Sequence, residues 1–190
     1  MTRILVADAH EVVRWGLQRV LHARPDFEVV AEATDGKQAI LKAILAKPDV
    51  AVIEYSLPLI NGLEVTRRLR RRLPRTEILI FTTELSETLV FACLRAGARG
   101  YLLKSDANHH LLDAVSALAT HRPYFTDDVS QMLLVSFLAR PRRSPEKPAH
   151  RQPPEPLAAQ LNQNQTIADN LDNLKIGHNS RPINPTPIPR

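Results

Sequence analysis

The stretch RILVADAH, residues 3–10, opens the first of five similar units in this chain and decides the fold. In its first five residues, Arg3 to Ala7, four aliphatic side chains follow the arginine, which is typical of a buried strand. Asp8 and His10 follow directly, where such a strand would end. Apolar residues then recur at helical spacing from about residue 10 to residue 23. The stretch therefore predicts a buried strand that leads into an amphipathic helix.

The same order of strand and helix recurs four more times along the sequence. Further apolar runs lie at residues 27–31, 50–53, 78–81 and 100–103, and a helical pattern follows each of them. The second helix begins at Asp35-Gly36, Pro74 stops the third, and Ser86 and Gly97 suit the start and end of the fourth. Because short strand–helix–strand units force parallel strands with right-handed crossovers, we predict a doubly wound α/β fold. The sheet should have five parallel strands, with helices on both faces.

The pattern changes after residue 121. Residues 127–138 predict one more helix, and from residue 141 the periodicity disappears. Residues 141–190 hold ten of the 15 prolines and six asparagines, and such a segment buries too little to offset its ordering entropy. We therefore predict a globular domain over residues 1–121, a linker helix within 122–140 and a mostly disordered tail over 141–190.

Composition narrows the classes of protein that the chain can belong to. No apolar run approaches the roughly 18 residues of a membrane span, and the N-terminal residues do not have the pattern of a signal peptide. The single cysteine, Cys93, cannot form an intrachain disulfide and is expected to be a packed, inert thiol. Net charge is +5, which alone does not establish nucleic-acid binding. We expect a cytoplasmic protein with no membrane partner.

Chemistry-bearing residues stand where four of the predicted strands end. Asp8 follows the first strand, Glu54 the third, Thr82 the fourth and Lys104 the fifth. Ligand sites of open α/β sheets lie at the carboxyl ends of the strands, so these side chains should converge on one pocket. Carboxylates, a hydroxyl and an ammonium together suit a metal ion and a phosphoryl group. The alternative is that Asp8 and Lys104 form a buried ion pair and nothing more.

Residues 1–120 resemble the receiver domain of response regulators in two-component systems, and look most like the class that carries a LuxR-type DNA-binding domain. The resemblance rests on ILVADAH, the DG of ATDG, SLPLINGLE, the strand-end Thr82 and AGARGYLLKSDA. It implies the flavodoxin-like (βα)5 receiver fold. It also implies a protein that passes on a signal rather than an enzyme, which agrees with the lack of a nucleophile–base pair or a cofactor loop.

The resemblance also assigns expected roles to individual residues. Asp8 would be a metal-binding acid, and the carbonyl of Ser56 a backbone ligand of Mg²⁺. Thr82 would bind a phosphoryl oxygen, and Lys104 would neutralise the charge of that group. Tyr101 would be the aromatic residue whose rotamer reports the switch. The implied partner is a histidine kinase or another signalling protein, and a homodimer is a further expectation.

Two positions depart from the family pattern. Ala9 stands where a second metal-binding acid is expected, so the Mg²⁺ site should be weakened or absent. Glu54 stands at the phosphoacceptor position where an aspartate is expected, and its extra methylene displaces the carboxylate by about 1.5 Å. In-line transfer tolerates such misplacement poorly. We therefore expect a degenerate phosphoacceptor pocket, in which Glu54 reaches toward Thr82 or Lys104 and places negative charge where a phosphoryl group would sit.

Two other hypotheses remain open at this point. The domain would still accept a phosphoryl group, on Glu54 or a neighbour, or it would belong to a transcription regulator whose tail contacts DNA. A LuxR-type helix-turn-helix requires a recognition helix. Prolines interrupt the tail where that helix should lie, so a remnant or frame-shifted DNA-binding region is expected, and specific DNA binding is not. The arginine-rich run 67–72 is interpreted as a solvated helix face, and His109-His110 as a surface pair without metal-ligand spacing.

Overall fold

A computed structural model describes residues 1–139 of the chain. The predicted tail, residues 141–190, lies outside the described residues. The parallel strands are β1 (Thr2–Ala7), β2 (Phe27–Ala33), β3 (Val50–Ile53), β4 (Glu77–Thr82), β5 (Gly100–Leu103) and β6 (Tyr124–Phe125). The helices are α1 (Glu11–Leu21), α2 (Gly36–Ala46), α3 (Gly62–Arg72), α4 (Glu87–Ala96), α5 (Ala107–Ala119) and α6 (Asp127–Ala139), with a short 3-10 turn at Lys104–Asp106. None of these helices is long and apolar enough to cross a membrane.

The sheet follows the order β2-β1-β3-β4-β5-β6, with every pair parallel. This confirms the doubly wound α/β fold and the five predicted strands, but it adds a sixth. β6 is only two residues long, and Gly100 and Tyr101 of β5 pair with Tyr124 and Phe125. A strand this short shows no alternation of side chains, so hydrophobic patterning could not find it.

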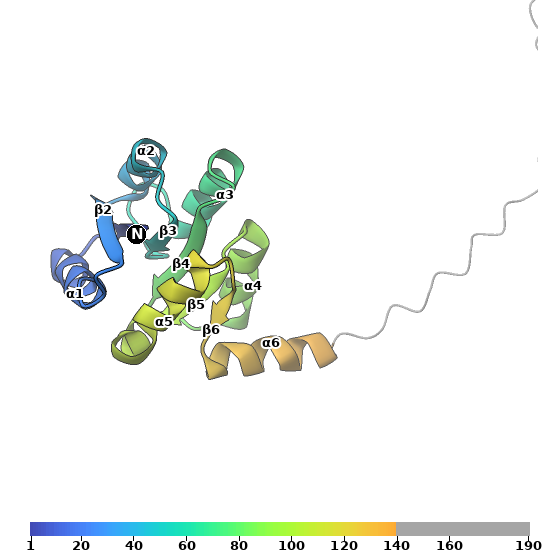
Figure 1. The fold of residues 1–190 in the computed structure, drawn as a ribbon. Coiled ribbons are helices and arrows are strands. Elements are labelled where there is room, and N and C mark those ends of the chain that lie inside the picture. The colour runs from blue at the N-terminus through green and yellow to red at the C-terminus, as the bar shows by residue number, and fades with distance from the viewer. Residues whose placement is uncertain (140–190) are drawn as a thin grey trace, which may run out of the picture. The chain divides into compact units, whose positions relative to one another are not determined.

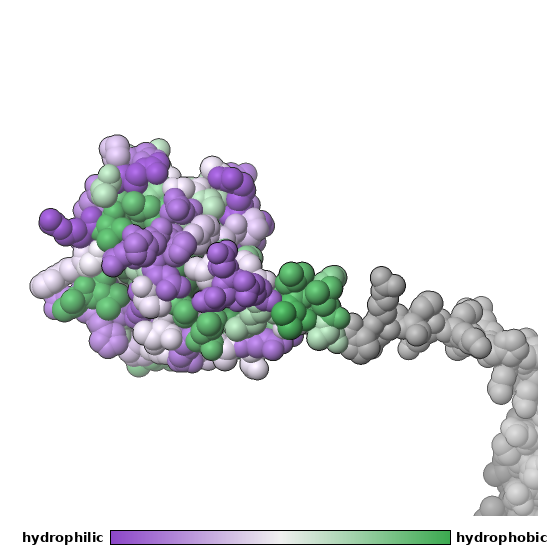
Figure 2. Space-filling view, turned by 90° about the horizontal axis from the view of Figure 1, so that it is seen from below, coloured by the Kyte–Doolittle hydropathy of each residue, from purple (hydrophilic) through white to green (hydrophobic). Residues whose placement is uncertain are grey.

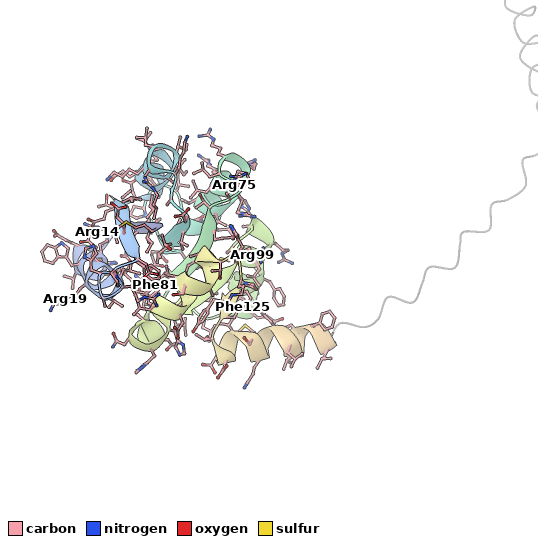
Figure 3. All side chains as sticks on the ribbon, viewed as in Figure 1. Arg14, Arg19, Arg75, Phe81, Arg99 and Phe125 are labelled. Carbon is pink, nitrogen blue, oxygen red and sulfur yellow. The ribbon has the colours of Figure 1, made fainter. Side chains whose placement is uncertain are left out.

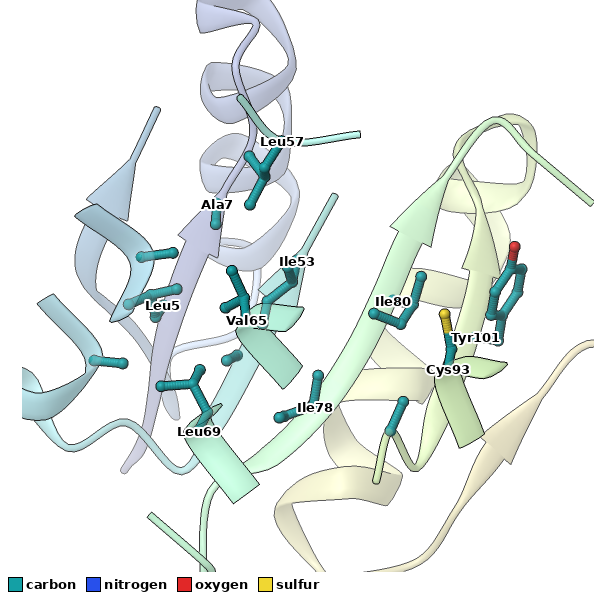
Figure 4. Packing of buried hydrophobic residues seen from close by; sticks show 14 of the residues in the cluster. Leu5, Ala7, Ile53, Leu57, Val65, Leu69, Ile78, Ile80, Cys93 and Tyr101 are labelled. Carbon is teal, nitrogen blue, oxygen red and sulfur yellow. The ribbon is translucent and has the colours of Figure 1, made fainter. Parts of the chain in front are cut away.

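Two hydrophobic clusters separate the sheet from its helices. On one face α2, α3 and α4 cover a cluster that includes Leu5, Ile53, Leu69 and Tyr101, and Val129 of α6 joins it (Figures 1 and 4). On the other face α1 and α5 pack over a second cluster, to which Phe81 belongs (Figure 3). Because β3 and β4 are buried on both faces, their carboxyl ends are fixed from both sides.

The helix ends match the sequence signals. The side chain of Asp35 accepts a hydrogen bond from the amide of Gln38 at the start of α2, and that of Ser86 accepts one from the amide of Leu89 at the start of α4. Gly97 ends α4 in the left-handed conformation, with φ of 109°. These caps satisfy backbone groups that a helix leaves without partners. The fourth helix therefore begins and ends where the sequence predicts.

A close approach of two backbone segments shapes the loop after β3. A Cβ atom added at Gly62 would lie 2.4 Å from the carbonyl oxygen of Glu54, so only glycine fits there. The amide of Gly62 donates to the carbonyl of Tyr55 at 2.7 Å. The start of α3 is thereby held against the backbone that carries Glu54, which fixes the position of that residue at the sheet edge.

Candidate functional site

Three of the sequence-predicted site residues meet in one ionic cluster at the carboxyl ends of the strands. The ammonium of Lys104 lies 2.6 Å from Oδ2 of Asp8 and forms a second ion pair with Oε2 of Glu54. Asp8 is fully buried and Glu54 is 6% exposed. One ammonium is therefore shared by two buried carboxylates, which leaves a formal charge of −1 in the cluster.

The electrostatics of Lys104 follow from this sharing. Burial lowers the pKa of the ammonium, but its hydrogen bonds and charge interactions with Asp8 and Glu54 outweigh that effect. The pKa therefore lies above its ordinary value of 10.5, and Lys104 remains charged at neutral pH. Buried carboxylates require such a partner, because an unpaired charge at this depth is costly.

The remaining oxygens of both carboxylates also have hydrogen-bond donors. Oδ1 of Asp8 accepts the amide of His10 at 2.9 Å, and the ring Nδ1 of His10 lies 3.2 Å from the same oxygen. Oε1 of Glu54 accepts the amide of Ser56 at 3.0 Å. The guanidinium of Arg14 donates to the carbonyls of Asp8 and Ala9 and so holds the loop after β1. Every carboxylate oxygen of the pair is occupied by groups of the protein itself.

This set of donors does not fit a magnesium ion. Mg²⁺ needs several oxygen ligands in near-octahedral geometry, and carboxylates are its main protein ligands. Here Ala9 contributes no side-chain oxygen, and the Lys104 ammonium lies between the two available acids. Within residues 1–139, histidine, cysteine and acidic side chains form no group of three that could hold a metal.

Thr82 and Tyr101 are joined through a residue that sequence reasoning missed, Glu84. The amide of Glu84 donates to Oγ1 of Thr82 at 3.3 Å, and its carbonyl accepts the hydroxyl of Tyr101 at 2.5 Å. Its carboxylate accepts the hydroxyl of Ser56 at 3.2 Å. Glu84 thus connects the loop between β4 and α4 to the ends of β3, β4 and β5.

No signal in the sequence pointed to Glu84, because an exposed acid in a loop is typical of a solvated residue. Tyr101, by contrast, is fully buried, and burial raises the pKa of its phenol above the ordinary value. Of the two residues toward which Glu54 was expected to reach, Thr82 or Lys104, the contact is with Lys104. The hydroxyl of Thr82 accepts a hydrogen bond from the Glu84 amide instead.

The other residues that the sequence analysis considered lie apart from this cluster. Cys93 is buried in the core, and burial raises the pKa of its thiol to about 11. His110 lies 2.8 Å from the hydroxyl of Tyr124. Arg70 differs from the solvated face predicted for the run 67–72, since it donates to the carbonyls of Pro74 and Thr76 at 3.0 and 3.2 Å.

Comparison with known families identifies the family to which this fold and this strand-end site belong. Residues 4–116 match the response regulator receiver domain, and this match spans more than half of the chain. The chain therefore belongs to the response regulator receiver family. Membership confirms the resemblance derived from the strand-end motifs, and the family belongs to two-component signalling rather than to conventional enzymes.

Individual relatives are named as transcriptional regulatory proteins. The transcriptional regulatory protein LiaR of Bacillus subtilis is 34% identical over 134 residues, which cover 70% of this chain and 64% of LiaR. An uncharacterized transcriptional regulatory protein of the same organism, YxjL, is 36% identical over 146 residues, which cover 76% of this chain and 67% of YxjL. This chain therefore spans about two thirds of the length of these curated relatives.

Solved structures superpose on the same region. A LuxR-family two-component response regulator from Aurantimonas sp. SI85-9A1 is 33% identical with a TM-score of 0.69, and the alignment covers 73% of this chain and 99% of that one. The signal receiver domain of the putative response regulator NarL from Mycobacterium tuberculosis is also 33% identical, with a TM-score of 0.61 and coverage of 64% and 98%. The receiver domain of RcsB from Salmonella enterica, solved with the phosphomimetic BeF3⁻, is 23% identical and shares the fold.

Proposed function

We propose that this receiver domain transmits its signal through protein contacts that do not depend on phosphorylation. The observation that carries the proposal is the shared ion pair of Asp8, Glu54 and Lys104 beside Ala9. A lysine that would neutralise an incoming phosphoryl group is here already bonded to two carboxylates. The pocket contains its own anion in the form of the Glu54 side chain.

The state of the Glu54 carboxylate argues against its use as a nucleophile. One of its oxygens is paired with an ammonium and the other accepts a backbone amide. Hydrogen bonds from charged donors withdraw electron density from the attacking oxygen, and both bonds would have to break before in-line attack. Phosphoryl transfer also relies on cations that neutralise charge in the transition state. With Ala9 in place of an acid, the pocket lacks one of the ligands for the metal ion that would do so.

The contacts of Glu84 support the second half of the proposal, an output surface held in one arrangement. A threonine and an aromatic residue at these positions are the expected switch elements of the family. In this chain the backbone of Glu84 connects Thr82 to the buried Tyr101, and its side chain binds Ser56. The surface built from the β4–α4 loop and α4 would then be fixed by the protein's own hydrogen bonds, and partners would bind it without a prior phosphorylation step.

A phosphorylatable receiver of a transcription regulator is the second candidate function, and the names of the relatives favour the part that concerns transcription. Two-component signalling implies a histidine kinase as partner, and a kinase would have to place a phosphoryl group on Glu54 or on a neighbour. The two candidates differ in one observable, the acyl phosphate.

Intact-mass spectrometry after incubation with Mg²⁺ and acetyl phosphate distinguishes them. We expect no added phosphoryl mass on the wild-type chain and little on Glu54→Asp, because the metal site still lacks an acid. Ala9→Asp combined with Glu54→Asp should become labelled, since Asp8, Thr82 and Lys104 are all present. A labelled wild-type chain would refute the proposal. An unlabelled double variant would show that Ala9 and Glu54 are not what prevents transfer.

A further inference from the structure

The end of α3 carries more positive charge than the protein itself neutralises. Glu64 pairs with Arg68 at 2.8 Å. Arg71 and Arg72, further along the helix, are exposed, and neither guanidinium has a hydrogen-bond or ion-pair partner within the described part of the chain. Arginines three and four residues apart repel each other, and Arg68 stands in that relation to both. The helix dipole favours cations in a last turn, so charge within the helix alone does not distinguish function from structure.

Two further cations stand near the end of α3 without the same structural reason. Arg75 lies in the turn after α3, outside any helix (Figure 3). Lys47 ends α2 in the left-handed conformation, with φ of 47°, where glycine would be less strained. Both side chains are exposed, and neither has a partner among the residues that the structure describes. A helix dipole does not account for Arg75, and the backbone at Lys47 disfavours the residue that is there.

A buried hydrogen bond holds the turn that carries Lys47 against the turn that carries Arg75. The hydroxyl of Thr76 donates to the carbonyl of Pro48 at 2.7 Å, and Thr76 is only 3% exposed. A groove with a volume of about 510 Å³ lies between the two turns, and Lys47, Arg72 and Arg75 all line it. The three cations are thus set around one groove by a fixed contact between two segments of the chain.

A second hollow continues from this groove along α3. It has a volume of about 400 Å³ and is lined by Glu64 and three arginines, of which Arg72 also lines the groove. The cations of the groove and the hollow are defined here as the basic track: Lys47, Arg68, Arg71, Arg72 and Arg75.

The basic track concentrates positive charge that the rest of the domain lacks. Residues 1–139 contain 17 lysines and arginines against 16 aspartates and glutamates, and five of the 17 belong to the track. Two acids line it, Asp49 and Glu64. The carboxylate of Asp49 accepts the amide of Arg3 at 2.8 Å, and Glu64 pairs with Arg68. A nearly neutral domain thus presents one strongly positive surface, which attracts polyanions.

We propose that the basic track binds the phosphate backbone of nucleic acid without regard to base sequence. Four of its five cations are arginines, whose planar guanidinium groups bind phosphate oxygens in pairs. No large apolar side chain between residues 60 and 84 is exposed. A protein partner would require an apolar interface core, whereas contacts to nucleic acid are mostly made to phosphates. Figure 2 shows exposed apolar side chains at the end of α6 instead.

The number of unpaired cations sets the expected strength of binding. Lys47, Arg71, Arg72 and Arg75 have no acid partner among the described residues, so about four phosphates should be neutralised. The logarithm of the binding constant should then fall with the logarithm of salt concentration, with a slope of about −3.6 on duplex DNA. Dissociation constants on the order of 10⁻⁵ M at physiological salt are typical of such contacts. The phosphoacceptor pocket takes no part in this inference, which does not rest on the proposed function.

Fluorescence anisotropy of the full chain with a labelled DNA duplex tests the track, at salt concentrations from about 50 to about 200 mM. Arg71→Gln combined with Arg72→Gln should flatten the salt slope by about 1.8 and weaken binding at the lowest salt by about tenfold or more. The matched control is Arg19→Gln with Arg95→Gln, since these exposed arginines lie in the last turns of α1 and α4. Circular dichroism of each variant confirms that the fold is kept.

Three results would overturn the proposal: no binding of the wild-type chain at the lowest salt, an equal loss in the control, or a track variant that binds as tightly as the wild type. The last of these would place the contact on other residues of the chain. A preference of more than about tenfold between duplexes of unrelated sequence would also contradict it, since phosphate contacts carry no sequence information.

Competition with two other polyanions distinguishes nucleic acid from alternative partners. Polyglutamate represents an acidic protein segment, and vesicles of phosphatidylserine and phosphatidylcholine represent an anionic membrane surface. At equal concentration of negative charge, unlabelled DNA should displace the labelled duplex at least about fivefold more effectively than either competitor. Displacement by polyglutamate or by vesicles at equal or lower concentration would overturn the assignment to nucleic acid.

Discussion

Two buried glutamates at opposite ends of neighbouring strands have different electrostatic surroundings. Glu54 follows the last residue of β3, and Glu77 begins β4. They are 6% and 4% exposed. Glu77 faces three cationic or potentially cationic groups: its Oε1 lies 2.8 Å from His121, and its Oε2 lies 3.8 and 3.9 Å from Arg70 and Arg99.

The difference between Glu54 and Glu77 distinguishes a structural ion cluster from a functional site. The partners of Glu77 come from α3, from the residue before β5 and from the turn after α5, so Glu77 ties those segments together, although its Oε2 lies too far from both guanidinium groups for a hydrogen bond. Glu54 competes with Asp8 for a single ammonium. The carboxyl edge of the sheet therefore holds excess negative charge in a buried place, which stability alone does not require. Perturbed charge of this kind is typical of functional positions.

The largest effect should come from removing the shared cation. Lys104→Met leaves Asp8 and Glu54 buried together without a counterion, and we expect a loss of about 3 kcal/mol in the free energy of unfolding. Urea denaturation measures it. Lys42→Met is the control, because that ammonium bonds to a backbone carbonyl, that of Glu32, and pairs with no carboxylate within residues 1–139. If both lysine variants lose the same small amount of unfolding free energy, the ion cluster of Asp8, Glu54 and Lys104 does not contribute to stability in the way proposed.

A smaller loss is expected at the opposite edge. Glu77→Gln keeps the size of the side chain but removes the charge that pairs with Arg70, Arg99 and His121, and should cost about 2 kcal/mol. Glu64→Gln serves as a control, since its ion pairs with Arg67 and Arg68 are exposed and screened by solvent. A Glu77→Gln variant that is as stable as the wild type would refute the structural role assigned to the cluster around Glu77.

Glu54→Gln should have the smallest effect on stability. The substitution removes one of two carboxylates that share Lys104, so the formal charge of the cluster changes from −1 to 0. We expect the free energy of unfolding to stay within about 1 kcal/mol of the wild type or to rise slightly. A loss as large as that of Glu77→Gln, measured under the same conditions, would mean that Glu54 is also a structural residue.

Sequence alone predicted most of the fold because the five long apolar runs and their helices have clear periodicity. It also predicted that Asp8, Glu54 and Lys104 lie at one edge of the sheet, since parallel strands end together. It missed β6, whose two residues are too few to show alternation. It anticipated an Asp8–Lys104 pair and a Glu54–Lys104 contact as separate possibilities, but not that one ammonium would serve both carboxylates, since side-chain geometry decides that.

Residues that act through the backbone or across long separations were also beyond sequence reasoning. Glu84 joins Thr82 and Tyr101 through its amide and carbonyl, which every residue type except proline possesses, so its identity gave no signal for these two contacts. Arg70 belongs to a run whose pattern indicates a solvated face, yet it lies beside Gly97, where an added Cβ would approach its Cγ to 2.6 Å. Its contact with Glu77 depends on that local space.

The central claim is that Glu54, Lys104 and Glu84 already hold the arrangement that a phosphoryl group would otherwise produce. Amide resonances of residues 82–104, recorded with and without Mg²⁺ and BeF3⁻, test it most directly. We predict that the wild-type signals stay unchanged. In the double variant Ala9→Asp with Glu54→Asp, the signals should shift on addition, toward their wild-type positions. Saturable shifts in the wild-type protein would contradict the claim, because they would show a pocket that still binds and responds to a phosphoryl mimic.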